Sequence, residues 1–265
     1  MINTLRNGTL EYQAAEGIAV PHAFTTRRGG VSRDDLDSLN LGVHRGDDRA
    51  NVEENFRILG RTLGFSTADL VLSNQVHGNT VRAVTRAHGR GIDNRDYPAC
   101  DGLITNDPGT ALLIFTADCT PILLWDPVTG AVGAVHAGWR GTALDIAGEA
   151  VRKMAAEFGC DPANIRAAIG PNIGPCCFQT DADVPEAMTA ALGPQALDAI
   201  RPHGEKYYVN LKTINAQFLK NAGVRHIEIS PHCTMCMHDT YWSHRYTRGR
   251  RGSQGAVIVC KEVQK

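Results

Sequence analysis

Three side chains that could bind a metal ion each stand at the end of an apolar run. His77 ends LVLSNQVH, Cys119 ends TALLIFTADC and His136 ends AVGAVH. Imidazole nitrogens and cysteine thiolates are common zinc ligands, and three protein ligands leave the fourth tetrahedral position open for water or substrate. Zinc can lower the pKa of its bound water to ~7, which supplies hydroxide near neutral pH. Taken singly, each residue could instead be a buried thiol or a hydrogen-bonded loop histidine.

Charged residues near these positions could bind an anion. Asp118 could hydrogen-bond a ligand histidine, act as an acid–base group or cap the end of its strand. The segment 138–141 is expected to begin a helix, where free backbone N–H groups and the guanidinium of Arg140 could hold phosphate. Arg45 and Arg245 could close around the same phosphate. Arg140 could equally be a surface side chain.

The chain has eight cysteines, for which reduced thiols are the favoured interpretation. The run PHCTMCMH carries Cys233 and Cys236 between two histidines, which is half of a common zinc arrangement. No second Cys-x-x-Cys pair completes it, so packing is favoured over a metal at this place. Cys176 and Cys177 are adjacent, and neighbouring side chains usually point apart. We therefore expect this pair to line a turn rather than to share a metal.

Length and composition predict one globular domain over residues 1–265. The chain is 43% hydrophobic and 21% charged, with a formal net charge of -1. This charge offers no general basic field for nucleic acid or for an anionic membrane surface. No apolar run approaches the ~20 residues of a spanning helix, and the first residues lack the apolar core of a signal peptide. We expect a cytoplasmic protein that binds small molecules; a monomer and a homodimer both remain open.

The elements that must position these side chains alternate without any repeat. Turn residues such as NDPG and DPVTG separate apolar runs in the middle of the chain. Strands are expected at 18–25, 70–77, 80–84, 101–105, 110–119, 121–126, 131–136, 164–170, 226–230 and 255–260. Helices are expected at 52–63, 144–158, 183–192 and 211–222, and a long polar loop at 29–50. Strands in runs with helices grouped between them predict an α+β fold with mixed sheets.

Motifs spread in order over nearly the whole chain resemble the YfiH family of laccase-domain proteins, also called peptidoglycan editing factors and formerly polyphenol oxidases. They are SLNLGVHRGDD, NQVHGNTV, DGLIT, ADCTPILLWDP, AVHAGWRGT, IGPNIGPCCF, NLKTINAQFL and CTMCMHDTYWSHR. The resemblance implies a layered αββα architecture related to cysteine hydrolases of the cytotoxic-necrotising-factor type. It also implies that His77, Cys119 and His136 form a zinc site.

The resemblance further implies purine nucleoside chemistry. The expected reaction is phosphorolysis of adenosine, inosine and methylthioadenosine to the free base and ribose-1-phosphate or its methylthio form, with some adenosine deamination. The catalytic candidates are then Cys119, His136, Asp118 and Arg140. The candidates for binding substrate are Asn40, Arg45, Gln75 and Arg245.

Other activities stay open for the same three residues. A cysteine-type hydrolase that edits UDP-MurNAc-L-Ser precursors would use Cys119 as nucleophile and His136 as base, and metal would then inhibit. Two histidines and a cysteine could also bind copper adventitiously. Oxygen reduction by a laccase needs further coppers held by His-x-His pairs, and none of the ten histidines forms one. A non-enzymatic metal-binding protein would use the polar loop 29–50 as an interaction surface.

The C-terminal segment SHRYTRGRRGSQGAVI departs from the family pattern, which tends to show Ser-x-Arg-Arg followed by Thr-Gly-Arg. Arg245 matches this pattern, Tyr246 replaces the second arginine, and Ser253 stands where the last arginine would be. If that last arginine binds substrate in relatives, either substrate choice has shifted or a neighbour takes its place: Arg248, Arg250 or Arg251.

Overall fold

The computed structural model describes residues 1–262, apart from the side chain at position 94. Its first sheet has six strands in the order β1 (Ile2–Asn7), β2 (Leu10–Ala15), β3 (His22–Thr25), β15 (Gln254–Val259), β7 (Ala111–Thr116) and β4 (Leu70–Leu72). Only the β4–β7 pair of this sheet is parallel.

The second sheet also has six strands and is likewise mixed. Their order is β14 (His226–Ile229), β10 (Arg166–Ile169), β8 (Thr120–Trp125), β9 (Val132–Ala137), β6 (Gly102–Thr105) and β5 (Val81–Ala83). A third, smaller sheet contains β11 (Gln179–Thr180), β13 (Lys206–Val209) and β12 (Ile200–His203). Helices and mixed sheets confirm the predicted α+β class.

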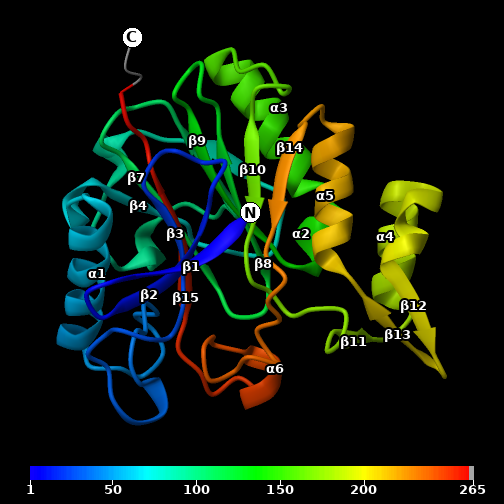
Figure 1. Cartoon of the computed structure of the whole chain (residues 1–265), viewed down its shortest axis with the longest axis horizontal. Helices are drawn as coiled ribbons and strands as arrows, with labels where there is room; N and C mark the ends of the chain where they lie inside the picture. The colour runs from blue at the N-terminus through cyan, green and yellow to red at the C-terminus, as the bar shows by residue number, and fades with distance from the viewer. Residues whose placement is uncertain (263–265) are drawn as a thin grey trace.

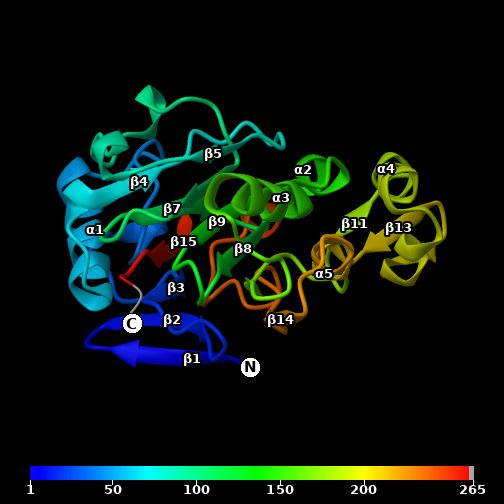
Figure 2. The same ribbon diagram turned by 90° about the horizontal axis from the view of Figure 1, so that it is seen from above.

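Helices cover the outer faces of the two large sheets, as Figures 1 and 2 show. The helices are α1 (Arg49–Leu63), α2 (Trp139–Ala143), α3 (Ile146–Phe158), α4 (Asp183–Leu192), α5 (Leu211–Asn221) and α6 (His244–Thr247). Helix α1 packs on the first sheet, whereas α3 and α5 pack on the second. The two sheets face each other between these helices, which gives the layer order αββα. No helix of the described residues is both long and apolar enough to cross a membrane.

The alternation of side chains along β9 shows how the two cores form. Val132 and Ala134 pack in the core shared with the first sheet, whereas Val135 and Ala137 pack in the core under the helices. Successive strand residues point to opposite faces, so His136 shares the face of Val132 and Ala134. His136 therefore points into the space between the two sheets.

The segment from the helix start expected at 138–141 to residue 158 forms two helices in the structure. Helix α2 ends at Ala143, and Asp145 takes a left-handed conformation with φ of 54°. The Asp145 carboxylate then accepts a hydrogen bond from Gly148 N–H and caps α3. Leu144, which the sequence placed on the apolar helix face, is 53% exposed. The N-cap at Asp145 therefore starts a new helix within the predicted one, although the apolar residues repeat at helical spacing across it.

The hairpin of β1 and β2 is a further element that the apolar pattern did not predict. Strand β1 is almost entirely exposed, so it carries no alternation of apolar and polar residues. The local signal is Asn7-Gly8, with Gly8 at φ of 59° in the turn.

Candidate metal and substrate site

Antiparallel pairing of β8 with β9 brings Cys119 and His136 together. Pro121 lies opposite His136 and Thr120 lies opposite Ala137, so the start of β8 adjoins the end of β9. Cys119 directly precedes β8. The third residue, His77, comes from the loop between β4 and β5. The side chains that the sequence placed at three strand ends thus converge at one edge of the fold.

The three side chains are close enough to share one ion. The ligand atoms of His77, Cys119 and His136 all lie within 4.8 Å of one another. The two imidazole rings meet edge to face, with centroids 4.9 Å apart. His136 is buried, Cys119 is partly buried and His77 is exposed. This donor set fits zinc, since it offers two imidazoles and a thiolate and keeps one side open.

Asp101 is the residue that orients this group. Its Oδ1 lies 2.8 Å from Nδ1 of His136, and the carboxylate also accepts the backbone N–H groups of Val76, His77 and Gly78 at 2.9–3.1 Å. The bond to Nδ1 leaves Nε2 of His136 free for a metal or for Cys119. The bonds from the Asp101 carboxylate to the backbone also hold the loop that carries His77. His77 has a φ of 61° there, a conformation that residues other than glycine seldom adopt.

Sequence reasoning missed Asp101, although it opens the motif DGLIT that was assigned only to a strand. The available signal was an acidic residue at the head of a wholly apolar run. Asp101 is fully buried, and a buried carboxylate must find hydrogen-bond donors. From the sequence alone those donors could not be identified, because they come from residues 76–78 and 136.

The sequence left three roles open for Asp118: a partner of a ligand histidine, an acid–base group, or a cap at the end of its strand. The structure agrees with the last of these. Its carboxylate accepts hydrogen bonds from Thr234 Oγ1 at 2.5 Å, Ser243 Oγ at 3.1 Å and Arg245 N–H at 2.7 Å. These donors all come from the C-terminal segment. Asp118 therefore ties that segment to the start of β8, and within the described chain it has no hydrogen bond to either ligand histidine.

The charges in the site favour an ionised sulfur. Burial acts to raise the pKa of the Cys119 thiol, but the imidazoles of His136 and His77 outweigh burial and lower it. Burial acts to lower the pKa of His136, but the Cys119 sulfur and the Asp101 carboxylate outweigh it and raise the pKa. Thiolate is the form of cysteine that binds zinc and also the form that attacks as a nucleophile.

A cavity of about 300 Å³ opens onto the three ligand residues. Arg45 and Arg251 contribute two guanidinium groups to its wall. Neither arginine forms an ion pair with any residue that the structure describes. Burial, aided by the charge of Arg45, lowers the pKa of Arg251 to about 10, and the Arg251 Nε is buried without a hydrogen-bond partner. Two adjacent cations that form no ion pair with a described carboxylate make this part of the cavity wall suitable for an anion.

Gln75 and Asn40, two of the predicted substrate residues, shape the cavity. Gln75 lines it, but both ends of its amide bond to the backbone of Phe115, at 2.7 and 2.8 Å. Asn40 is fully buried behind the cavity, where its Oδ1 accepts Gly42 N–H and Ser253 N–H. Asn40 thereby joins the loop that carries Arg45 to the C-terminal segment.

The structure does not bring Arg140 and Arg245 to the cavity. Arg140 is exposed and stacks on the ring of Trp139, with its guanidinium carbon 4.2 Å from the ring centroid. Arg245 donates from Nη1 to the carbonyl of Gln179 at 3.0 Å. Neither lies in the described cavity wall. Arg140 therefore matches the surface alternative.

Of the three arginines that the sequence offered in place of the missing family arginine, Arg251 is the one in the cavity wall. Its Nη1 donates to the Gly252 carbonyl at 2.9 Å and to Ser253 Oγ at 3.0 Å, and both Arg251 and Ser253 line the cavity. Of the other candidates, Arg250 reaches Asp35 on the surface at 3.3 Å. Tyr246 stacks on the ring of His238 with centroids 3.6 Å apart.

Gly138 lies against the ligand side chains, and a side chain at this position would take up the space that they fill. A Cβ at this position would lie 2.9 Å from Cδ2 of His77 and 3.4 Å from Sγ of Cys119. Its φ of -66° is ordinary, so alanine strains no backbone there. We expect Gly138→Ala to push the His77 ring aside and to weaken zinc binding about tenfold or more, with little change in Tm.

Competition with a chelator measures that affinity, and Gly78→Ala is the matched control. A Cβ at Gly78 meets no atom closer than 3.8 Å, so this neighbouring variant should bind zinc as the natural protein does. Unchanged zinc affinity in Gly138→Ala would show that the ion is not held between these side chains.

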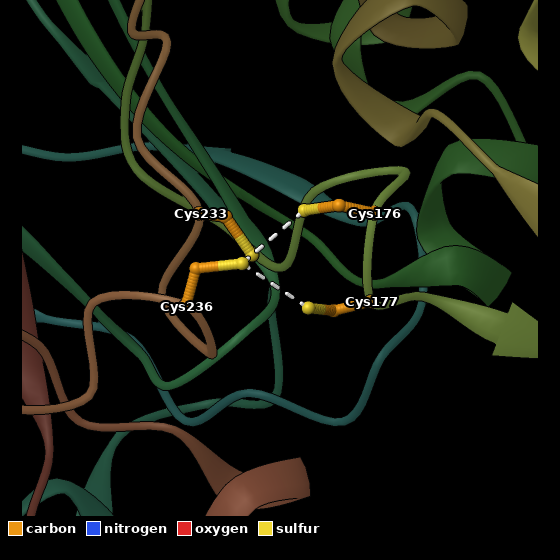
Figure 3. Close-up of side chains that lie close together, drawn as sticks. All are labelled: Cys176, Cys177, Cys233 and Cys236. Atoms are coloured by element: carbon orange, nitrogen blue, oxygen red, sulfur yellow. Dashed lines mark hydrogen bonds between the residues drawn. The ribbon is translucent and has the colours of Figure 1, made fainter.

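A second group of sulfur atoms lies away from this cavity. Cys176, Cys177, Cys233 and Cys236 have all four Sγ atoms within 4.8 Å of one another (Figure 3). The expectation that Cys176 and Cys177 point apart and that no partner completes Cys233 and Cys236 was wrong. The two loops that carry these pairs fold against each other, and a tight turn aims both adjacent thiols at Cys236.

Comparison with known proteins supports the resemblance seen in the motifs. Residues 21–261 match the family described as multi-copper polyphenol oxidoreductase laccase. Purine nucleoside phosphorylase YlmD of Geobacillus stearothermophilus is 40% identical over 246 residues, which cover 90% of this chain and 89% of that protein. Purine nucleoside phosphorylase YfiH of Escherichia coli is 37% identical over 251 residues, which cover 92% and 95%.

A solved structure extends the agreement to the fold. The crystal structure of the Bacillus licheniformis hypothetical protein YfiH superposes with a TM-score of 0.92 at 34% identity, over 98% of this chain and 99% of that one. The match to the family model covers the whole second sheet, the strands β3, β4, β7 and β15 of the first, and every residue of the candidate site. The chain therefore belongs to the laccase-like family that includes these YfiH and YlmD proteins.

Proposed function

We propose that this protein is a zinc-dependent purine nucleoside phosphorylase that cleaves adenosine, inosine and methylthioadenosine, with adenosine deamination as a side activity. One observation carries the proposal: a single cavity is lined both by the metal-ligand group His77, Cys119 and His136 and by two guanidinium groups that form no ion pair with a described carboxylate. Its volume of about 300 Å³ suits a small molecule. The names of the YlmD and YfiH relatives support the same chemistry.

Arg45 and Arg251 would hold phosphate beside the nucleoside. Guanidinium binds phosphate by charge-assisted, often bidentate hydrogen bonds, which fixes the orientation of the attacking oxygen. That oxygen forms a bond to C1′ of the ribose while the bond from C1′ to N9 breaks. The purine leaves with the electron pair and takes up a proton, which yields free base and ribose-1-phosphate. Phe115, whose backbone Gln75 holds, would give the purine an aromatic wall.

Zinc held by His77, Cys119 and His136 would supply a Lewis acid and, for deamination, an activated water. The residues of this chain prepare that place in two ways. Asp101 keeps the proton of His136 on Nδ1, and His77 and His136 keep Cys119 ionised. Copper fits the same donors, but the ten histidines include no His-x-His pair for the further coppers of a laccase.

A second candidate function rests on a different feature of the same residues. Asp101, His136 and Cys119 follow one another as the acid, base and nucleophile of a hydrolytic triad, with 2.8 Å between Asp101 Oδ1 and His136 Nδ1. In a hydrolase that edits UDP-MurNAc-L-Ser, Cys119 would attack the amide carbonyl and His136 would protonate the departing serine. Water would then cleave the resulting thioester, which releases UDP-MurNAc and restores Cys119. Zinc on these side chains would then inhibit.

Product analysis separates these functions. Purified protein is incubated with adenosine and phosphate, and separately with UDP-MurNAc-L-Ser. We expect ribose-1-phosphate and free base in equal amounts, formed only when phosphate is present. The base should be mainly adenine, with some hypoxanthine from the smaller amount of inosine that deamination produces. Release of serine without any free base would favour the hydrolase. If neither serine nor free base is formed, the remaining alternative is a metal-binding protein without catalytic activity.

A further inference from the structure

Four cysteine sulfurs meet where two loops cross, outside the substrate cavity. Cys176 and Cys177 follow β10, and Cys233 and Cys236 follow β14. The Sγ of Cys236 lies 3.4 Å from that of Cys176 and 3.3 Å from that of Cys177, and all four sulfurs point to one centre (Figure 3). A tetrahedral zinc with Zn–S bonds of ~2.3 Å separates its sulfurs by roughly 3.8 Å. The observed separations, from 3.3 Å to at most 4.8 Å, lie on both sides of this value, so small shifts of the side chains would let the four sulfurs bind one zinc ion.

The backbone around the four sulfurs is arranged for ligands. Gly174 N–H donates to Sγ of Cys233 at 3.1 Å, and such bonds orient a thiolate. A Cβ on Gly174 would lie 3.2 Å from Cβ of Cys233 and 3.4 Å from Sγ of Cys176, so glycine leaves room for the group. Thr234 N–H donates to the Asn172 carbonyl at 2.9 Å, which locks the two loops together.

A buried cation lies beside the group. Lys212 is 6% exposed, and its Nζ donates to the carbonyls of Ser230 at 2.6 Å and His232 at 2.7 Å. No carboxylate of the described residues forms an ion pair with it. Burial lowers the pKa of the Lys212 ammonium to about 8, and the sulfurs of Cys233 and Cys176 act in the opposite direction. Zinc with four thiolates carries two net negative charges, which this ammonium would partly balance.

We propose that Cys176, Cys177, Cys233 and Cys236 form a second metal site, a closed structural zinc site distinct from the one in the cavity. Four thiols lose their protons when zinc binds, and no open position remains for substrate. The histidines beside Cys233 and Cys236 are not ligands. His232 Nδ1 lies 2.8 Å from Tyr241 OH, and His238 stacks on Tyr246.

Zinc at this position would hold the C-terminal segment against the active site. Thr234, which lies between two of the four ligands, donates to Asp118, and Asp118 also accepts from Ser243 and from Arg245 N–H. Cys119 is the next residue after Asp118. The second site would thus act on the cavity only by positioning, through a chain of hydrogen bonds that ends beside a ligand.

The test uses Cys119→Ala, which removes a ligand of the cavity site and leaves the four cysteines intact. Elemental analysis of the natural protein should give about two zinc ions per chain, and Cys119→Ala should retain one. X-ray absorption of the zinc left in Cys119→Ala should show four sulfurs at ~2.3 Å and no nitrogen. Adding Cys176→Ser and Cys236→Ser should remove this last ion, whereas adding Cys160→Ala, a buried thiol outside both groups, should not.

The result does not depend on the folding of the triple variant. Titration of Cys119→Ala with a mercurial should release its zinc as four thiols react. Cys119→Ala protein that is free of zinc with four reactive thiols would overturn the proposal. Disulfides among these cysteines, seen by non-reducing mass spectrometry of freshly purified protein, would overturn it as well. Neither outcome would contradict the proposed phosphorylase activity, because that proposal depends on the residues of the cavity.

Discussion

Replacing Cys119 with alanine is expected to remove the zinc ion of the cavity and to lower kcat/KM for nucleoside phosphorolysis by about a thousandfold. The thiolate is one of three ligands, and two histidines alone bind zinc far more weakly. A metal contributes several kcal/mol to transition-state stabilisation, and each 1.4 kcal/mol corresponds to about tenfold in rate. Zinc content and steady-state kinetics on the same preparation measure both effects.

His77→Ala and His136→Ala should reproduce the loss, because the three ligands act on one ion. Cys160→Ala is the matched control, since Cys160 is a buried thiol near Thr129, remote from the cavity. It should keep both its zinc and its activity. Undiminished cleavage of nucleoside by Cys119→Ala would rule out this group as the reaction centre.

The second large effect is expected at Arg45 and Arg251. Arg45→Ala and Arg251→Ala should each raise the KM for phosphate by about 10- to 100-fold and leave the KM for nucleoside nearly unchanged. A hydrogen bond to a charged group contributes ~1.5–3 kcal/mol, and truncation removes it for phosphate alone. Lysine at either position should restore phosphate binding only in part, because an ammonium lacks the planar fork of a guanidinium.

Arg140→Ala provides the matched control for the two arginines. Arg140 stacks on Trp139 outside the cavity, so its removal should leave both KM values in place. A phosphate KM that rises in Arg140→Ala but not in the other two variants would return the phosphate to the start of α2, where the sequence had placed it.

The sequence predicts that His77, Cys119 and His136 come together, as the structure has them, because their positions depend on local features. His77, Cys119 and His136 end apolar runs, and the ends of strands in facing sheets meet at one edge. The family motifs single out two of the ten histidines, His77 and His136, as the candidate ligands. The α+β class follows likewise from the order of apolar runs, and the mixed sheets agree with it.

Features that depend on long-range pairing could not be predicted. Asp101 orients His136 across 35 positions of the chain, and the apolar period of its strand says nothing about that bond. Arg251 and Arg140 carry the same chemistry in the sequence, and only the path of the chain before β15 and the direction of α2 separate them. The approach of Cys177 to Cys236 spans 59 positions and needs both loops in place.

Nucleoside turnover by protein freed of metal tests the central claim most directly. Dialysis against a chelator, with circular dichroism to verify that the protein stays folded, should abolish phosphate-dependent base release, and added zinc should restore it. Iodoacetamide should modify Cys119 slowly in the zinc-loaded protein, because a coordinated thiolate is protected. Full nucleoside turnover by rigorously metal-free protein, with rapid alkylation of Cys119, would contradict the account and leave the cysteine hydrolase in its place.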